Sequence, residues 1–136
     1  MTPVYIPADK ITEFLPLIWP HIDRFCRKFP AEYASRDILI GLLTGQMHGF
    51  MVWDEDKGCR AFAYGVLIND FDKTRSLRME MIEGEGLSEW RDALDAEFER
   101  FAKHHGCQRI RFIGRKGWKA VLPGWRVKYF VFERDI

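Results

Sequence analysis

The sequence predicts an α/β (α+β) domain with a mixed, mostly antiparallel sheet of about six strands and helices on both faces. Residues 77–82 and 108–113 have strand composition, and the segment 88–105 between them has apolar residues at helical spacing. A strand, a helix and a strand joined by short turns form a crossover, so we expect the two strands to lie parallel with the helix packed across them. Residues 48–68 form a predicted β-hairpin around the turn 54–58, and two helical segments precede it.

The central helix has one apolar face and a signal at each end. Its apolar residues recur at spacings of four, four and three, and they are Trp90, Leu94, Phe98 and Phe101. The hydroxyl of Ser88 is predicted to cap the free N–H groups at the start of this helix. Gly106 suits a left-handed cap at its end.

The remaining predicted elements are short, and prolines interrupt one of them. In chain order they are a strand at 4–6, a helical segment at 9–28, a helix from Ser35 to Gly45, a short helix at 117–122 and a strand at 127–132. Pro16 and Pro20 lie inside the segment 9–28, where a proline removes a helical hydrogen bond and clashes with the preceding turn. We therefore expect a kinked helix or two short helices there.

Composition limits the classes of function. The chain has 136 residues, 47% of them hydrophobic, which is enough for a single domain over residues 1–136. A net charge of +1 does not favour a polyanion binder. Cys26, Cys59 and Cys107 are far apart without metal-ligand spacing, so we expect reduced thiols, no metal site and a cytoplasmic location. The sequence shows no leader and no apolar run long enough to span a bilayer, so no membrane association is expected.

The order of elements, with a glycine-rich break after the fourth strand, resembles the GNAT acyltransferase superfamily over nearly the whole chain. More narrowly, a set of short motifs resembles small GNAT-like proteins encoded in phages and prophages. These motifs are 84–87 with Trp90, then 106–107, 114–118 and 121–125. The resemblance implies a GNAT-like fold and acetyl-CoA or another acyl-CoA as cofactor.

The resemblance also implies a cofactor site where the fourth and fifth strands splay apart. In the superfamily, the pyrophosphate binds backbone N–H groups of a loop patterned Gln/Arg-x-x-Gly-x-Gly/Ala, which suits the positive end of a helix dipole. Gly84 and Gly86 match the small positions, whereas Met81 stands at the Gln/Arg position, so the motif is degraded. The implied cofactor-binding residues are Met81, Ile82, Gly84, Glu85, Gly86, Leu87 and Ser88. The alternative is a tight strand-to-helix turn that binds no ligand.

The acid–base chemistry is also atypical. Many superfamily enzymes protonate the leaving thiolate with a tyrosine on the helix after the fifth strand, and the segment 117–122 contains none. Glu80 and Glu83, at the end of the fourth strand, are the candidate general bases for the acceptor amine. The alternative for Glu80 is a solvated or ion-paired strand residue, with Arg109 or Arg111 across the sheet as a candidate partner.

Charge is unevenly distributed along the chain. Between Glu80 and Glu99 there are eight acids and one base, Arg91, and this charge would repel a diphosphate. From Cys107 to Phe132 there is no acid, and the basic residues there are Arg109, Arg111, Arg115, Lys116, Lys119, Arg126 and Lys128. This basic segment could bind a polyanion. We favour the alternative that it pairs with the acidic central helix.

Three functions fit the sequence. The first is an acyl-CoA-dependent N-acyltransferase that acts on a protein or a small amine. The second is a non-catalytic GNAT-fold structural or interaction protein of a phage or prophage, associated with phage proteins or the virion. The third is a nucleic-acid binder with a basic surface, which we favour least. The sequence does not identify the acyl acceptor or the oligomeric state.

Overall fold

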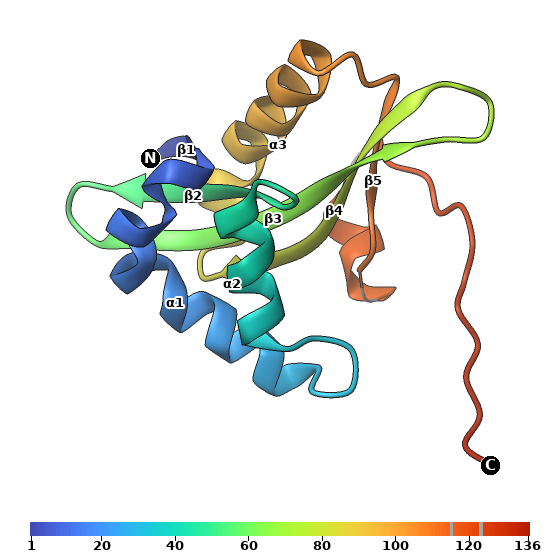
Figure 1. Cartoon of the computed structure of the whole chain (residues 1–136), viewed down its shortest axis with the longest axis horizontal. Helices are drawn as coiled ribbons and strands as arrows, with labels where there is room; N and C mark the ends of the chain where they lie inside the picture. The colour runs from blue at the N-terminus through green and yellow to red at the C-terminus, as the bar shows by residue number, and fades with distance from the viewer. Residues whose placement is uncertain (115, 123) are drawn as a thin grey trace.

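The computed structural model describes residues 1–114, 116–122 and 124–136 and contains one five-stranded sheet of order β1-β2-β3-β4-β5. The strands are β1 (Thr2–Ile6), β2 (His48–Asp54), β3 (Gly58–Asn69), β4 (Arg75–Gly84) and β5 (Arg109–Phe112). The helices are α1 (Ile11–Lys28), α2 (Ser35–Thr44), α3 (Leu87–His104) and the 3₁₀ turns η1 (Ala8–Lys10) and η2 (Lys116–Val121). Helices α1 and α2 cover one face of the sheet and α3 covers the other (Figure 1).

The predicted crossover is confirmed. β4 and β5 pair in parallel, with Leu77 opposite Ile110 and Met79 opposite Phe112, whereas every other pair of neighbouring strands is antiparallel. The antiparallel pairing of β2 and β3 confirms the predicted hairpin. Its signal was local, because two apolar runs flank a polar turn. The apolar face of α3 packs on this sheet and buries Trp90, Leu94 and Phe98.

Both ends of α3 depend on glycines with positive φ. At its end Gly106 has a φ of 71°, Cys107 N–H donates to Ala102 O and Gly106 N–H donates to Lys103 O, which together form a Schellman cap. At its start the capping residue is Gly86, with a φ of 73° and no side-chain hydrogen bond. The prediction that Ser88 caps the helix is therefore wrong, because the left-handed turn at Gly86 starts the helix two residues before Ser88.

α1 is one continuous helix of 18 residues, so the predicted split into two helices is wrong. Pro16 and Pro20 lie four positions apart and are both exposed, so they share the solvent face. The carbonyl groups that lose their helical donors therefore lie near solvent, where water can replace the missing bonds. The opposite face of α1 buries Ile11, Ile18 and Ile22 against the sheet.

The predicted strand 127–132 is wrong, because in the part of the chain that the structure describes the sheet ends at β5. Residues 127–136 run away from the sheet toward the C-terminus (Figure 1), and Tyr129 and Phe132 are 65% and 91% exposed. Strand formation depends on cross-strand pairing and burial as well as on residue type. β5 offers only four residues as a pairing edge.

Candidate functional site

The candidate site lies where β4 and β5 separate. Pairing of the two strands ends at Met79 and Phe112, and the N–H of Ile113 makes one further bond to Met79 O at 3.1 Å. β4 continues to Gly84, so its last residues have no β5 neighbour. A β-bulge at Glu80, which has no opposing residue on β3, bends the strand at this point.

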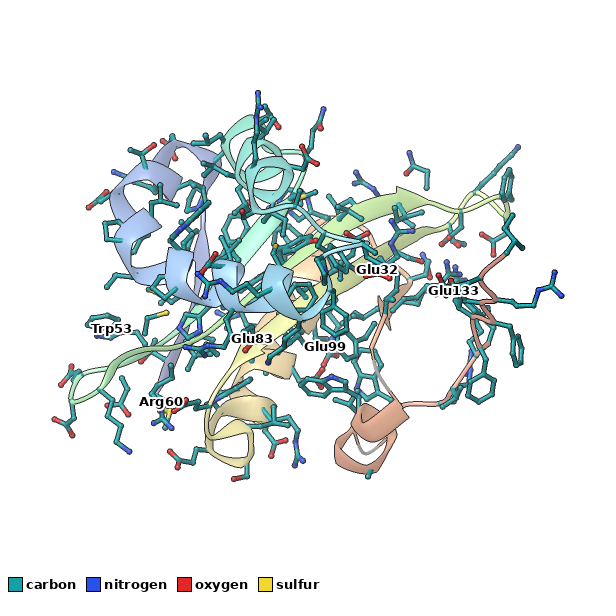
Figure 2. The ribbon with its side chains drawn as sticks, turned by 90° about the horizontal axis from the view of Figure 1, so that it is seen from below. Glu32, Trp53, Arg60, Glu83, Glu99 and Glu133 are labelled. Carbon is teal, nitrogen blue, oxygen red and sulfur yellow. The ribbon has the colours of Figure 1, made fainter. Side chains whose placement is uncertain are left out.

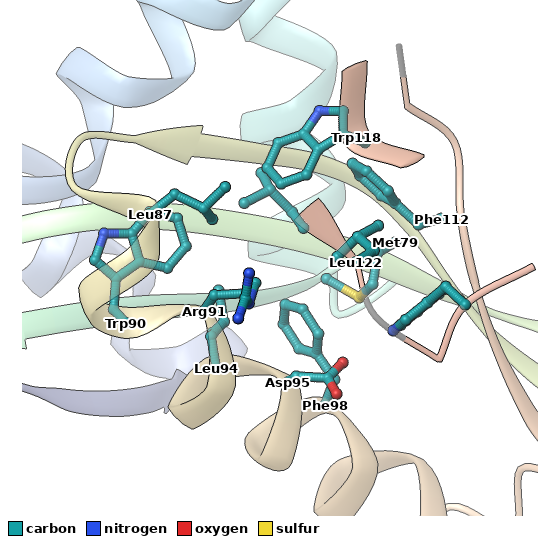
Figure 3. A pocket seen from close by; sticks show the side chains of 12 residues that line it. Met79, Leu87, Trp90, Arg91, Leu94, Asp95, Phe98, Phe112, Trp118 and Leu122 are labelled. Atoms are coloured by element: carbon teal, nitrogen blue, oxygen red, sulfur yellow. The ribbon is translucent and has the colours of Figure 1, made fainter. Parts of the chain in front are cut away.

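A cleft of about 250 Å³ opens at this separation on the face that α1 covers. Its lining comes from the end of α1 and the connector that follows, from β4, and from β5 and η2. The lining residues are Phe25, Phe29, Glu32, Tyr33, Glu80, Ile82, Glu83, Phe112, Ile113, Gly114 and Trp118. A much smaller cavity of about 20 Å³ lies on the α3 face, and it shares Ile82, Phe112 and Trp118 with the cleft (Figure 3).

Both candidate bases lie in the cleft, and each carries a different ion pair. Glu80 Oε1 accepts hydrogen bonds from Arg78 Nη2 at 2.7 Å and Arg78 Nε at 3.1 Å. Glu80 is thus an ion-paired strand residue, as the alternative expected, but its expected partner is wrong. Asp70 in the β3–β4 loop pairs with Arg109 and Arg111 instead, at 2.7 and 3.0 Å. The Glu80 side chain remains 15% exposed to the cleft.

Glu83 is more strongly engaged. Its two carboxylate oxygens accept bonds from Lys28 Nζ at 2.9 and 3.1 Å, Arg24 lies 3.8 Å away, and the side chain is only 8% exposed. Because both cations come from α1, this pairing ties the end of α1 to β4 (Figure 2). The geometry favours Glu83 as an anchor of the cleft wall and leaves Glu80 as the better-placed base.

Two tyrosines near Glu80 were not among the predicted site residues. Burial raises the pKa of Tyr33, which lines the cleft, and the Glu80 carboxylate raises it further. Burial and then Glu80 also raise the pKa of Tyr64, which comes from β3. Both phenols therefore stay protonated at neutral pH. Tyr33 lies in an irregular connector, where the sequence offers no periodic signal that would reveal it.

The two glycines of the implied cofactor loop have packing reasons of their own. A Cβ on Gly84 would lie 2.5 Å from Arg60 O and 2.6 Å from the Ala61 Cβ, so β3 and β4 approach closely there. Gly86 needs its positive φ to turn the chain into α3, and a Cβ there would clash with the Arg60 guanidinium. A tight strand-to-helix turn thus accounts for both glycines without a ligand.

The other implied cofactor residues are dispersed. Met81 is fully buried in the core that α1 and α2 cover, so its side chain does not face the loop. Ile82 lines both cavities, and Leu87 lines the smaller one. The side chains of Glu85 and Ser88 are exposed at the start of α3.

Arg60 lies on β3 and contacts the loop between β4 and α3, and no pattern in the sequence predicted this contact. Its Nη1 lies 3.3 Å from both Asp54 Oδ2 and Glu89 Oε2, and its Nη2 donates to Glu85 O at 3.4 Å. Trp90 Nε1 donates to the same carbonyl at 2.7 Å. The strand β3 thus brings a cation to the acidic loop from a position 25 residues earlier in the chain (Figure 2).

Among the described side chains of the basic C-terminal segment, Arg109 and Arg111 pair with the β3–β4 loop instead of the acidic helix. Arg109 and Arg111 pair with Asp70, and Arg109 also lies 3.5 Å from Asp72, because the parallel register sets Arg109 beside the start of β4. Arg126 and Lys128 are exposed. The side chains of Arg115, Lys116 and Lys119 lie outside the described residues.

The described residues offer neither a cluster of metal ligands nor a helix that could span a membrane. No group of three or more His, Cys, Asp or Glu side chains there could hold a metal ion. No helix in the same residues is long and apolar enough to cross a bilayer.

Comparisons with known proteins support the fold. No family model matches the chain, and neither does any curated protein. Solved structures do match over nearly the full length. A probable acetyltransferase has a TM-score of 0.70 at 14% identity, with 100% of this chain and 98% of that chain covered.

Two other matches have more specific names. The aminoglycoside acetyltransferase meta-AAC0020 from an uncultured soil metagenomic sample, solved with sisomicin, has a TM-score of 0.67 at 10% identity, with 99% and 95% covered. A ribosomal-protein-alanine N-acetyltransferase from Brucella melitensis has a TM-score of 0.63 at 10% identity, with 98% and 100% covered. At these identities the likeness concerns the fold alone, and the chain has the GNAT acetyltransferase fold, with five strands instead of about six.

Proposed function

We propose that the chain is an acyl-CoA-dependent N-acyltransferase whose acceptor amine binds in the cleft beside Glu80. The observation that carries this proposal is the separation of β4 and β5 after Met79 and Phe112, which opens a cleft of about 250 Å³ with a carboxylate on its floor. The start of α3, a position suited to anions, follows directly on the same strand.

The residues at the start of α3 are compatible with a bound diphosphate. Three of the four nearby carboxylates already have cationic partners: Glu80 has Arg78, Glu83 has Lys28, and Glu89 has Arg60. Glu85 is exposed, so its carboxylate can turn toward solvent. The first helical N–H groups would then hold the phosphates, and Ile82 and Leu87 would contact the apolar part of the cofactor.

The chemistry assigned to the chain is proton transfer and positioning. Acyl-CoA would supply the acyl group as a thioester, so that the amine nitrogen forms the amide bond, the carbon–sulfur bond breaks and CoA leaves as its thiol. The Glu80 carboxylate accepts the proton that the acceptor ammonium must lose before its nitrogen is nucleophilic. Arg78 fixes the orientation of that carboxylate. Tyr33 also lines the cleft, and its raised pKa keeps its hydroxyl group protonated at neutral pH.

The first experiment measures acetyl-CoA binding by thermal shift and calorimetry. A site with a Kd near 10 μM would add about 2.7 kcal/mol of stability at about 1 mM ligand, a melting shift on the order of 10 °C. We expect a shift of no more than a few degrees, because Met81 stands at the Gln/Arg position and its buried side chain has no polar group to contact the cofactor. Glu85→Gln should enlarge the melting shift, because it removes a negative charge near the phosphates. Glu99→Gln is the control, since Glu99 lies on the exposed side of α3 and pairs with Lys103.

The second experiment measures thiol release in the presence of an amine. Glu80→Gln should lower kcat by about 100-fold or more, the size expected for a lost general base, while acetyl-CoA binding is retained. A protein that neither binds acetyl-CoA nor releases thiol would overturn the proposal and favour the non-catalytic module, such as a phage protein, that uses the fold without its chemistry.

A further inference from the structure

The cleft is unusual in its combination of aromatic rings and carboxylates. Five of its eleven lining residues are aromatic. Phe25, Phe29 and Tyr33 form one group at the end of α1, with ring centroids 4.9 to 6.4 Å apart. Phe112 and Trp118 form a second group from β5 and η2, in an edge-to-face contact at 5.0 Å. Between the two groups lies the floor from β4, which carries Glu80.

The charges that line the cleft have one sign. Its ionisable lining residues with described side chains are Glu32, Glu80 and Glu83, and no basic side chain lies among them. Lys28 and Arg24 hold Glu83, whereas Glu32 is exposed and Glu80 receives bonds from Arg78 at one oxygen only. Because Arg78 and Lys28 compensate the charges of Glu80 and Glu83, the selection acts at hydrogen-bond distance and not through net charge. An ammonium group can donate a charge-assisted hydrogen bond to the Glu80 carboxylate, and aromatic faces add further attraction for a cation.

The cleft offers few groups for a polar, hydroxyl-rich ligand. Apart from the three carboxylates, Tyr33 carries the only hydroxyl group among the described lining residues, and the rest of the lining is apolar or glycine. Its volume of about 250 Å³ lies below the roughly 300–1,000 Å³ typical of sites for drug-sized ligands. A ligand that fits is small, with one ammonium group and one flat apolar group.

We infer that the cleft binds small primary amines that carry an aromatic ring, that is, arylalkylamines, with the ring between the two aromatic groups and the ammonium at Glu80. The assignment of such an amine as the acyl acceptor rests on the proposed function, whereas its binding does not. This ligand class differs from the polyhydroxylated sisomicin of one solved relative. It also differs from a protein N-terminus, whose backbone amides would lose hydrogen bonds to water in the apolar part of the cleft.

The test is calorimetric titration of the whole chain with four probes, without and with saturating CoA. The probes are 2-phenylethylamine, 2-phenylethanol without the charge, ethylamine without the ring, and sisomicin. In at least one of the two conditions, 2-phenylethylamine should bind roughly tenfold or more tightly than each of the others. Equal or tighter binding of ethylamine or sisomicin would overturn the inference, as would no binding of 2-phenylethylamine in both conditions.

Variants separate the two parts of the recognition. Glu80→Gln should weaken 2-phenylethylamine about tenfold and leave 2-phenylethanol unchanged, because only the amine has the charge. Trp118→Leu should weaken both compounds, because both have the ring. Glu99→Gln is the control and should change neither. If Glu80→Gln weakens the binding of 2-phenylethanol as much as that of 2-phenylethylamine, Glu80 does not bind the ammonium group and the inference fails.

The two proposals fail in different ways. If acetyl-CoA is neither bound nor consumed while 2-phenylethylamine binds selectively, the acyltransferase proposal fails and the amine site stands. If acetyl-CoA is consumed with a peptide amine while 2-phenylethylamine neither binds nor reacts, the acyltransferase proposal stands and the arylalkylamine assignment fails.

Discussion

At the scale of single residues, long-range partners decide what each charge does. The acids near the start of α3 look uncompensated along the chain, yet Arg60 reaches Glu89 from β3 and Lys28 reaches Glu83 from α1. Arg60 Nη2 also bonds Glu85 O next to Gly86, where the guanidinium fills the space that a side chain would need. Gly86 is therefore constrained twice, by its φ and by Arg60.

This double constraint predicts the cost of Gly86→Ala. A left-handed residue other than glycine costs about 1–2 kcal/mol, and displacing Arg60 from its partners should add about 1 kcal/mol more. Gly106→Ala is the matched control, because Gly106 has a similar φ of 71° with nothing within 4 Å of a new Cβ. Urea unfolding should show that Gly86→Ala costs more than Gly106→Ala.

The same comparison in an Arg60→Ala background completes the test. With the guanidinium gone, Gly86→Ala should cost no more than Gly106→Ala, since only the backbone strain remains. An unchanged cost in that background would mean that Arg60 does not restrict the turn.

At the scale of elements, the end of α3 brings histidines from two elements together. The ring of His48 on β2 lies 6.0 Å from that of His105 just beyond α3, and Tyr5 O–H can donate to His48 Nδ1 at 3.0 Å. Burial lowers the pKa of His48, and the charges of His105 and Arg75 lower it further. The folded protein therefore favours the neutral form of His48 where β1, β2 and the end of α3 meet.

The sign of the resulting pH dependence follows from linkage. Unfolded His48 titrates near its ordinary pKa of about 6.5, whereas the folded protein resists that proton. The contribution of His48 to stability is therefore fully present above about pH 6.5 and is lost as the pH falls toward its lower folded pKa. We expect His48→Asn, which keeps an acceptor for Tyr5, to lose less stability than the wild type between pH 7.5 and 5.5.

Urea unfolding at the two pH values measures this difference. His104→Gln, which removes an exposed histidine at the end of α3 whose ring contacts His105 rather than His48, is the control for a general loss of charge. The assignment to His48 would be refuted by identical losses in the wild type and in His48→Asn.

At the scale of the whole molecule, the sheet of the described residues ends at a four-residue edge strand, and the chain beyond η2 adds little to the core. Val131 and Phe132 are 84% and 91% exposed. Trp125, by contrast, is partly buried and lines the small cavity beside α3. The boundary of the folded unit should therefore lie between Trp125 and Val127.

Two truncations test this boundary. Deleting residues 127–136 removes mostly exposed side chains, so it should change the melting temperature by no more than a few degrees. Deleting residues 125–136 also removes Trp125 and should cost clearly more. A drop on the order of 10 °C for the shorter deletion would show that residues 127–136 stabilise the domain and that the boundary lies further along the chain.

The sequence by itself determined the parallel pairing of β4 and β5, the hairpin, the buried face of α3 and the turn at Gly106. These features depend on periodicity and turn residues within a few positions of each other, and such signals are local. Glu80 and Glu83, which were candidate bases from their position at the end of a predicted strand, both line the cleft, and their catalytic role stays a prediction.

Only the tertiary structure decided which charges meet and where the sheet stops. The bulge at Glu80 and the contact of Arg60 with the loop follow from strand register, which no local pattern displays. The pairing of Glu80 with Arg78, by contrast, joins residues two apart on one strand. The tail 127–132 has strand composition, yet composition cannot supply the partner edge that a strand needs. Residues far apart in sequence meet only after the sheet has formed, so their chemistry is set by the fold and not by spacing along the chain.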